Sequence, residues 1–203
     1  KYILVLSESI QIYGHSVKGK WQVYDREKKA FQTIFDGKLI QEPTFSPDGK
    51  KVAFVFDNNL YYQDLTSNKI TQITKDGKKN EIINGITDWV YEEEFAFVRH
   101  FDWNAEGSAL AFVRFDESAV REFYIPIYKG DLYPTEMRFK YPKAGEDNSK
   151  VSLHLFDLKS NKIENVNLSS VENYYIPQIK FTKDKNTLAV LTSNRHQNKV
   201  DVN

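Results

Sequence analysis

The chain has 203 residues, and its 28 basic side chains are balanced by 28 acidic ones, so its formal net charge is zero. This balance argues against a nucleic-acid or anionic-membrane binder, because such proteins usually carry a basic excess. Cysteine is absent, which excludes disulfides and thiolate metal sites. Aromatic residues make up 14% of the chain. They favour strands, because aromatic side chains suit a pleated, half-buried surface.

The first residues already read as a strand, with no initiating methionine before Tyr2, so we expect a segment of a longer protein. Residues 14–20 have the spacing of a phosphate-binding loop, but Trp21 stands where magnesium coordination needs serine or threonine. Strand-like residues follow, so no helix N-terminus is predicted to hold a phosphate. The four histidines are isolated in sequence. We therefore predict no nucleotide, metal or other cofactor.

A turn motif recurs along the chain. It consists of an aromatic residue, a polar turn and a short apolar run at a constant offset, and it begins at Phe45, Trp103 and Phe181. An apolar strand end, a polar turn and a second apolar strand are the signature of a β-hairpin.

A second polar turn alternates with the first. Residues 64–70 and 157–163 are nearly identical, and residues 24–31 are a looser copy. Two turns in constant alternation indicate a repeated four-stranded blade, as in a β-propeller. A β-sandwich with similarly spaced turns is the alternative. We predict an all-β chain in which residues 1–203 form a fragment of a multi-bladed β-propeller with four-stranded antiparallel blades.

One predicted blade contains an insertion, since the stretch from Trp103 to Asp157 is far longer than its counterpart in the preceding blade. Within about residues 116–141, apolar and polar residues alternate on both sides of a Gly130-Asp131 turn, which predicts a two-stranded ribbon. An isolated hairpin is marginal in water, so we expect the ribbon to pack outside its own blade. Five apolar side chains would line one face: Phe123, Ile125, Ile127, Met137 and Phe139.

Residues 85–95 break the repeat pattern. Glu92, Glu93 and Glu94 are consecutive and lie among aromatic residues, which is unusual for a strand. One interpretation is a solvated acidic turn. The other is a socket for a ligand ammonium group, which two carboxylates satisfy through charge-assisted hydrogen bonds.

Two segments carry a resemblance to a known family. Residues 85–95 resemble the double-glutamate motif of the dipeptidyl peptidase IV family, in the prolyl oligopeptidase clan, and residues 141–145 resemble a second family segment after the ribbon. The similarity runs from about Tyr13 to the end of the chain. It implies an N-terminal propeller that caps a C-terminal α/β-hydrolase domain. That domain is expected to be absent here, since the chain has no G-x-S-x-G elbow.

The resemblance also implies a function. The family removes dipeptides from peptide N-termini and prefers proline or alanine next to the cut. The last two glutamates of its motif bind the substrate ammonium group, and by position these are Glu93 and Glu94, whereas Glu92 is left without a substrate role. The catalytic serine, aspartate and histidine belong to the hydrolase domain, so no catalytic residue is expected in this chain.

The partners implied by the resemblance are a peptide with a free N-terminus, the protein's own hydrolase domain and, through the ribbon, a second copy in a homodimer. The expected location is extracytoplasmic, either periplasmic or attached to the cell envelope. One position departs from the family pattern. Gly14 stands where members often carry an arginine that contacts the substrate carbonyl. Either Arg99 or Arg114 substitutes, or the substrate backbone is bound differently.

Two other functions compete with the exopeptidase segment. A TolB-type binding or scaffolding propeller carries the same turns as residues 46–49, but it has no use for paired glutamates between aromatic residues or for a long ribbon. A propeller glycosidase is a third possibility, although the Ser-x-Asp-x-Gly turn of sialidases does not fit the spacing at Ser46. The paired glutamates favour the exopeptidase segment.

Overall fold

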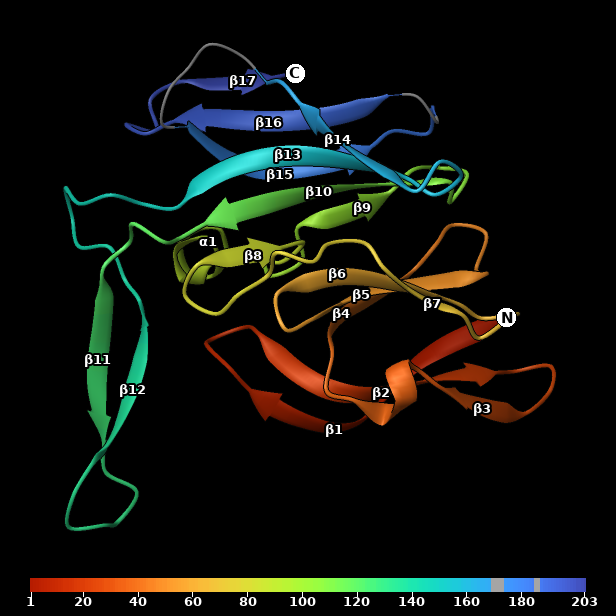
Figure 1. Cartoon of the computed structure of the whole chain (residues 1–203), viewed down its shortest axis with the longest axis horizontal. Coiled ribbons are helices and arrows are strands. Elements are labelled where there is room, and N and C mark those ends of the chain that lie inside the picture. The colour runs from red at the N-terminus through yellow and green to blue at the C-terminus, as the bar shows by residue number, and fades with distance from the viewer. Residues whose placement is uncertain (169–173, 185–186) are drawn as a thin grey trace.

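The computed structural model describes residues 1–168, 174–184 and 187–203. Its antiparallel sheets are stacked in chain order, from the N-terminal sheet at the bottom of Figure 1 to the C-terminal sheet at the top. The prediction of an all-β propeller fragment is confirmed. Within the described residues, no helix has the length and apolar character needed to cross a membrane.

The first two sheets are continuous meanders with strands in sequence order. The first contains β1 (Tyr2–Gln11), β2 (Val17–Asp25) and β3 (Ala30–Thr33), and a short 3-10 helix (Phe35–Gly37) follows it. The second is a complete four-stranded blade of β4 (Gln41–Phe45), β5 (Lys51–Phe56), β6 (Asn59–Asp64) and β7 (Ile70–Gln72).

The third sheet has five strands and the fourth has three. In the third sheet, one edge of β10 (Ala109–Asp116) pairs with two short strands, β8 (Ile82–Asn84) and β9 (Phe101–Trp103). The other edge of β10 pairs with β13 (Lys150–Asp157), which pairs in turn with β14 (Lys162–Val166). The fourth contains β15 (Tyr174–Phe181), β16 (Leu188–Asn194) and β17 (Val200–Val202). The predicted turn after Phe181 includes Lys185, which lies outside the described residues.

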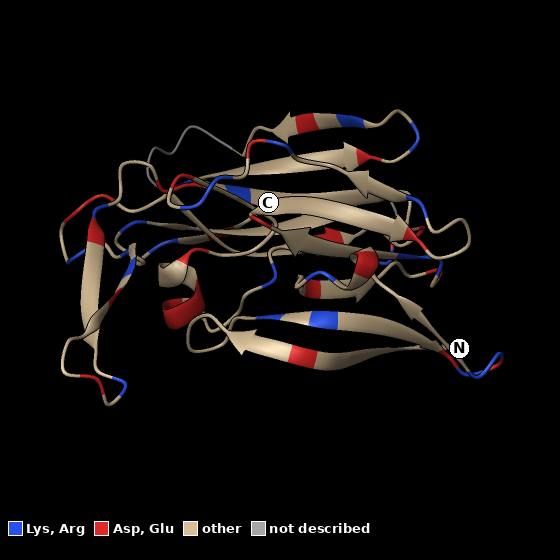
Figure 2. Cartoon of the chain, turned by 60° about the horizontal axis from the view of Figure 1, so that its bottom comes forward, with Lys and Arg blue, Asp and Glu red and all other residues tan. Residues whose placement is uncertain are grey.

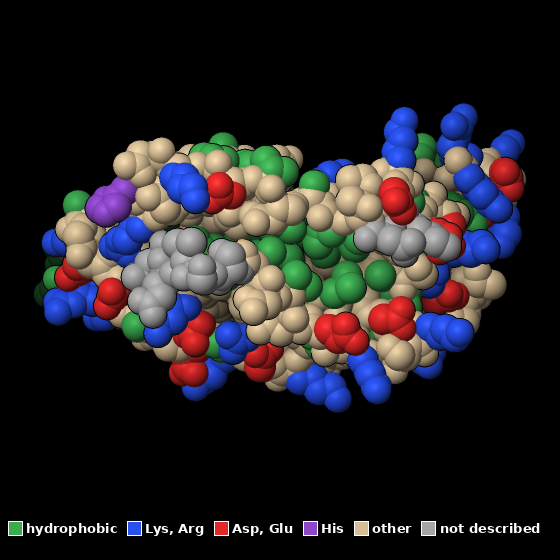
Figure 3. Space-filling view, turned by 90° about the horizontal axis from the view of Figure 1, so that it is seen from above, with side chains coloured by type: hydrophobic (Ala, Val, Ile, Leu, Met, Phe, Trp, Pro, Cys, Tyr) green, Lys and Arg blue, Asp and Glu red, His purple; other side chains and the backbone are tan. Residues whose placement is uncertain are grey.

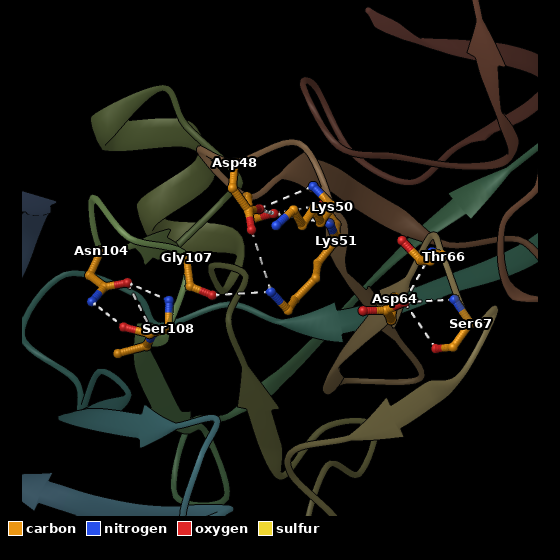
Figure 4. A network of polar contacts seen from close by, with 11 residues as sticks. Asp48, Lys50, Lys51, Asp64, Thr66, Ser67, Asn104, Gly107 and Ser108 are labelled. Atoms are coloured by element: carbon orange, nitrogen blue, oxygen red, sulfur yellow. Dashed lines mark hydrogen bonds and ion pairs between the residues drawn. The ribbon is translucent and has the colours of Figure 1, made fainter.

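Short polar side chains close the predicted turns. The Asp48 carboxylate accepts hydrogen bonds from the Ser46 hydroxyl at 2.6 Å and from the Lys50 backbone N–H at 3.0 Å. The Asp64 carboxylate accepts from the backbone N–H of Ser67 at 2.8 Å (Figure 4). Aspartate favours turns because its side chain can replace a backbone acceptor two or three residues away. The turn chemistry therefore explains why the hairpins are readable from sequence.

Neighbouring blades also contact each other through these turns. Lys51 donates from Nζ to the carbonyl oxygen of Gly107 in the next blade at 3.5 Å (Figure 4). Gly107 has a φ of +64°, and a Cβ there would lie 3.2 Å from the Cβ of Ser46. Between the third and fourth blades, Lys180 pairs with Asp102 at 2.9 Å. Polar contacts thus join neighbouring blades, at a turn in the first case and between two strands in the second.

The core lies between the sheets. On β5, Val52 and Phe54 pack toward the first sheet, whereas Ala53 and Val55 pack toward the third, and all four are fully buried. Successive strand residues point to opposite faces, so a blade covered on both faces has a continuous apolar strand. Seen from above, hydrophobic side chains also gather in the middle of the upper end of the stack, between charged rims (Figure 3).

The predicted ribbon is present. β11 (Glu122–Ile127) and β12 (Thr135–Lys140) pair only with each other among the described residues, and they project to one side of the stack (Figure 1). Phe123 lies opposite Phe139, and Ile125 lies opposite Met137.

Candidate functional site

The acidic cluster lies on a short α-helix, α1 (Trp89–Phe95), rather than on a strand or in a simple acidic turn. β8 and β9 pair with successive parts of the same edge of β10, so together they form one inner strand that is interrupted by residues 85–100. Gly85 leads the chain out of the sheet with a φ of +79°, which residues with a side chain rarely adopt. The helix is therefore an insertion into the inner strand of the third blade.

The sequence carries local signals for this helix. The Asp88 carboxylate caps the N-terminus by accepting from the backbone N–H of Tyr91 at 3.0 Å, a common arrangement for aspartate. Tyr91 and Phe95, one turn apart, have ring centroids 5.1 Å apart. A seven-residue helix is nevertheless marginal alone, so contacts with other blades must hold it.

Two of these contacts reach different parts of the stack. The hydroxyl of Ser149, just before β13, donates to Asp88 at 2.6 Å. The buried Tyr91 hydroxyl accepts a hydrogen bond of 2.9 Å from the backbone N–H of Ile176 in the fourth blade. Burial raises the pKa of Asp88, while its hydrogen bonds with Ser149 and Tyr91 oppose that rise. The helix is therefore fixed to its own blade and to the fourth blade.

The three glutamates have different environments. Glu92 is 1% exposed, and its Oε1 accepts hydrogen bonds from the backbone N–H groups of His15 and Ser16, both at 2.7 Å. Glu93 and Glu94 are exposed on the helix, whose acidic residues are visible beside the ribbon in Figure 2. Glu92 thus anchors the turn between β1 and β2, whereas its two neighbours are available to a ligand.

Gly14 lies in that anchored turn, directly beside Glu93. A Cβ at Gly14 would be 3.0 Å from Oε1 of Glu93. The two arginines expected as substitutes at this position have other partners: Arg99 donates to the Thr44 hydroxyl at 2.9 Å, and Arg114 pairs at 2.8 Å with Asp76, which lies between β7 and β8. The space beside Glu93 is therefore left open by the glycine.

An aromatic pocket of about 620 Å³ adjoins Glu93 and Gly14. Trp89, the first residue of α1, forms one wall of the pocket; its ring centroid lies 4.4 Å from that of Tyr141 and 5.8 Å from that of Phe139. Phe139 is only 4% exposed, so this predicted arm residue is covered within the chain. The root of the ribbon supplies the remaining apolar wall, through Phe123, Ile125 and Met137.

A second cavity, of about 530 Å³, joins the helix to the entrance of the ribbon. Glu117 lines it and is 6% exposed; burial raises the pKa of Glu117 to about 7, the charge of Asp88 adds to the rise, and Lys140 opposes it. Burial, together with the charges of Glu117 and Glu92, raises the pKa of Tyr13 to about 12. Across the described residues, no group of three or more histidine or acidic side chains is placed to hold a metal ion.

The fold and the insertion define a class: an open stack of β-propeller blades that carries an acidic helix in one inner strand and a projecting ribbon. The family model described as "Dipeptidyl peptidase IV (DPP IV) N-terminal region" matches residues 1–203. The chain belongs to this family, which confirms the resemblance stated above.

Relatives of known name support this family assignment. Dipeptidyl aminopeptidase B of Saccharomyces cerevisiae is 37% identical over 164 residues, covering 78% of this chain and 20% of that protein. Inactive dipeptidyl peptidase 10 of Mus musculus is 30% identical over 208 residues, covering 98% of this chain and 26% of that protein. The chain thus spans about a quarter or less of the length of these relatives.

Among solved structures, Porphyromonas gingivalis dipeptidyl peptidase 4 superposes with a TM-score of 0.95 and 42% identity, covering 99% of this chain and 29% of that one. A putative dipeptidyl aminopeptidase IV from Bacteroides ovatus, 24% identical, has a TM-score of 0.70 and supports the fold alone. The chain therefore corresponds to the N-terminal, non-catalytic region of dipeptidyl peptidases.

Proposed function

We propose that this chain is the substrate-anchoring propeller segment of a longer serine exopeptidase, which releases N-terminal dipeptides whose second residue is proline or alanine. The observation that carries the proposal is that the three glutamates of α1 differ in burial. Glu92 is buried and hydrogen-bonded to the backbone, whereas Glu93 and Glu94 are exposed. In this account, Glu93 and Glu94 receive the ammonium group of the peptide.

In this proposal, the Glu93–Glu94 pair determines the length of the released peptide. A carboxylate pair on a helix that is fixed to several blades holds the free amine at a set distance from the nucleophile of the hydrolase domain. Two residues then fit before the scissile bond. A peptide whose amine is blocked or lies further away would leave the desolvated carboxylates unpaired, which is costly. The chain contributes position, and the serine, aspartate and histidine of the hydrolase domain contribute the chemistry.

The test uses the full-length protein and three chromogenic anilides: Gly-Pro, N-acetyl-Gly-Pro and Ala-Gly-Pro. We expect release of the chromophore from Gly-Pro and a loss of more than about 100-fold in kcat/KM for the acetylated substrate, because a bound peptide that removes the two carboxylates from water without supplying an ammonium partner costs several kcal/mol. Ala-Gly-Pro, whose amine is one residue further away, should be equally poor. Similar values of kcat/KM for all three anilides would contradict the proposal that the glutamate pair sets the length of the released peptide.

A second candidate function is a non-catalytic binding module. It is favoured by one specific observation, namely that a relative covering 98% of this chain is called an inactive dipeptidyl peptidase. A TolB-like scaffold is the broader form of this alternative. Full-length protein that binds Gly-Pro peptides without cleaving them would support a binding module, and protein that ignores them would support the scaffold.

We further propose that the ribbon contacts a second copy of the full-length protein. Its tip carries large apolar side chains with little cover: Tyr128 is 65% exposed, Tyr133 79% and Leu132 85%. Exposed apolar patches of this kind often mark interaction surfaces. Of the predicted arm residues, Phe123, Ile125, Ile127 and Met137 keep accessible surface. A periplasmic or cell-envelope location stays a prediction.

A further inference from the structure

A third pocket, of about 490 Å³, lies between the second and third blades and shares no residue with the pocket beside Glu93. Its volume is within the roughly 300–1,000 Å³ typical of small-ligand sites. Its lining comes from the segment that follows β7 and from β8, β10, β13 and β14. Both blades are present in the described part of the chain, where their sheets are stacked on each other (Figure 1).

Part of the lining is apolar. Phe112 on β10 is buried, and Ile163 on the edge strand β14 is 43% exposed. The ring of His154 stacks on Phe112, with ring centroids 5.3 Å apart. Burial lowers the pKa of His154, the charge of Arg114 adds to the lowering, and Asp76 opposes it. The imidazole is therefore neutral at neutral pH and extends the aromatic wall.

The charged part of the lining favours an anion. It contains two basic side chains, Lys75 and Arg114, and one acidic side chain, Asp76. Arg114 donates from Nε to Asp76 at 2.8 Å, and this is its only side-chain hydrogen bond within the described residues. Its two other guanidinium nitrogens are available to a carboxylate, which a guanidinium binds through two parallel hydrogen bonds.

A buried acceptor lies next to this arginine. Asn84 lines the same pocket and is the partner of Arg114 in the pairing of β8 with β10. It is 0% exposed, and its Nδ2 donates to Asp76 at 3.0 Å. Its Oδ1 has no hydrogen-bond partner in the part of the chain that the structure describes. Because an unpaired buried acceptor is unfavourable, a ligand that brings an N–H group next to its carboxylate matches both residues.

We propose that this pocket binds an apolar amino acid whose amine is acylated and whose carboxylate is free. Arg114 receives the carboxylate, Asn84 accepts the N–H of the acylated amine, and Phe112 and Ile163 contact the apolar side chain. Both a free N-acyl amino acid and the C-terminal residue of a peptide offer this chemistry. The inference goes beyond the proposed function, because an acylated amine has no ammonium group for the glutamate pair.

The experiment is isothermal titration calorimetry of the full-length protein with N-acetyl-leucine, for which we expect saturable binding to one site per chain. N-acetyl-leucine amide, which lacks the charge, should bind at least about 10-fold more weakly, since a hydrogen bond to a charged group contributes about this factor. The salt of 4-methylpentanoic acid keeps the carboxylate and the apolar body but lacks the N–H, so it should also bind more weakly than N-acetyl-leucine.

A longer probe distinguishes the two sources of the ligand. Acetyl-Ala-Ala-Leu has the same last residue as N-acetyl-leucine, preceded by peptide. Tighter binding of this probe than of N-acetyl-leucine identifies the C-terminus of a peptide as the ligand. Weaker binding identifies a free N-acyl amino acid, and equal binding shows that the pocket holds the terminal residue alone.

Two variants test opposite kinds of contact. Arg114→Gln removes the guanidinium and should weaken binding of N-acetyl-leucine by at least about 10-fold. Ile163→Asp places a second carboxylate in the lining at an exposed position and should also weaken binding. Arg121→Gln is the matched control, because Arg121 is likewise paired with an acidic residue, Glu146 at 3.4 Å, but lies outside the pocket. Its affinity should equal that of the wild type.

The inference is wrong if N-acetyl-leucine shows no saturable binding, or if the acid and the amide bind equally well. Unchanged binding in Ile163→Asp would also overturn it, and this variant decides the matter even where Arg114→Gln does not fold. Cleavage of a Gly-Pro anilide is measured on the same protein. Protein that cleaves the anilide without binding N-acetyl-leucine keeps the proposed function and loses this site, whereas protein that only binds N-acetyl-leucine has the site without the proposed function.

Discussion

The buried carboxylate of Glu92 accepts a 2.7 Å hydrogen bond from the backbone N–H of Ser16, which lies in a different blade. A second bond of the same length comes from His15. Glu92 therefore joins the helix to the turn that carries Gly14, and it sets the distance between Gly14 and Glu93. Of three consecutive glutamates, the first is a structural residue that positions the site.

Replacing Glu92 should destabilise the chain. In Glu92→Ala, two backbone N–H groups lose their acceptor, and leaving buried donors unsatisfied costs about 1–3 kcal/mol each. Glu92→Gln keeps an acceptor oxygen and should cost less. Urea unfolding followed by tryptophan fluorescence measures both, with Glu94→Ala on the exposed face as the control. A Glu92→Ala variant as stable as Glu94→Ala would show that these bonds contribute nothing.

Glu117 should make stability fall with rising pH. Its pKa is about 7 in the folded chain against 4.5 in the unfolded chain, so the folded state keeps the proton longer. The contribution is present below pH 4.5 and is lost as pH rises toward 7, by at most about 3 kcal/mol. The measurement is the free energy of unfolding from pH 4 to 8 for the wild type and Glu117→Gln. Parallel curves would contradict the assignment.

Gly85 should tolerate alanine poorly. Its φ of +79° costs a residue with a Cβ about 1 kcal/mol, and a Cβ there would also lie 3.2 Å from Cδ1 of Leu60 in the core. Overpacking adds roughly 1–3 kcal/mol. Gly145→Ala is a matched control, because Gly145 has a φ of +84° with nothing within 4 Å of its Cβ position. Equal losses in thermal stability for Gly85→Ala and Gly145→Ala would show that the contact with Leu60 contributes nothing to the cost at Gly85.

The ribbon should determine assembly. We expect full-length protein in which a short Gly-Ser turn replaces residues 118–139 to lose the dimer, since the exposed apolar tip is removed. Light scattering over a range of concentrations gives the mass and the dissociation constant. A milder variant, Leu132→Ser with Tyr133→Ser, tests the tip alone while the root of the ribbon still covers Trp89. An unchanged dissociation constant in both variants would show that the ribbon is not an assembly element.

The sequence predicts the features that local chemistry determines. The Asp48 and Asp64 turns form through bonds within a few residues, and the ribbon's alternation is visible in one segment of the chain. The α1 helix was not predicted, because its seven residues are stabilised by partners that are distant in sequence, such as Ile176. The pocket was also missed, because Trp89 and Phe139 meet only through the fold.

The same limit applies to the glutamates. Nothing in three identical consecutive residues says which one is buried, and the resemblance assigned Glu93 and Glu94 by position only. The structure supplies the physical difference, because the two backbone donors that bind Glu92 come from another blade. Long-range hydrogen bonds of this kind have no signature in the local sequence.

The most direct test of the central claim is kcat/KM of the full-length protein for a Gly-Pro anilide in Glu93→Gln and Glu94→Gln, with Glu92→Gln and the exposed Glu164→Gln on β14 measured alongside. Removing one partner of a desolvated charge pair costs about 2–5 kcal/mol, so each of the first two variants should lose at least about 30-fold. Glu92→Gln should lose much less, and Glu164→Gln should match the wild type. Equal losses in Glu92→Gln, Glu93→Gln and Glu94→Gln, or no loss in any of them, would contradict the account.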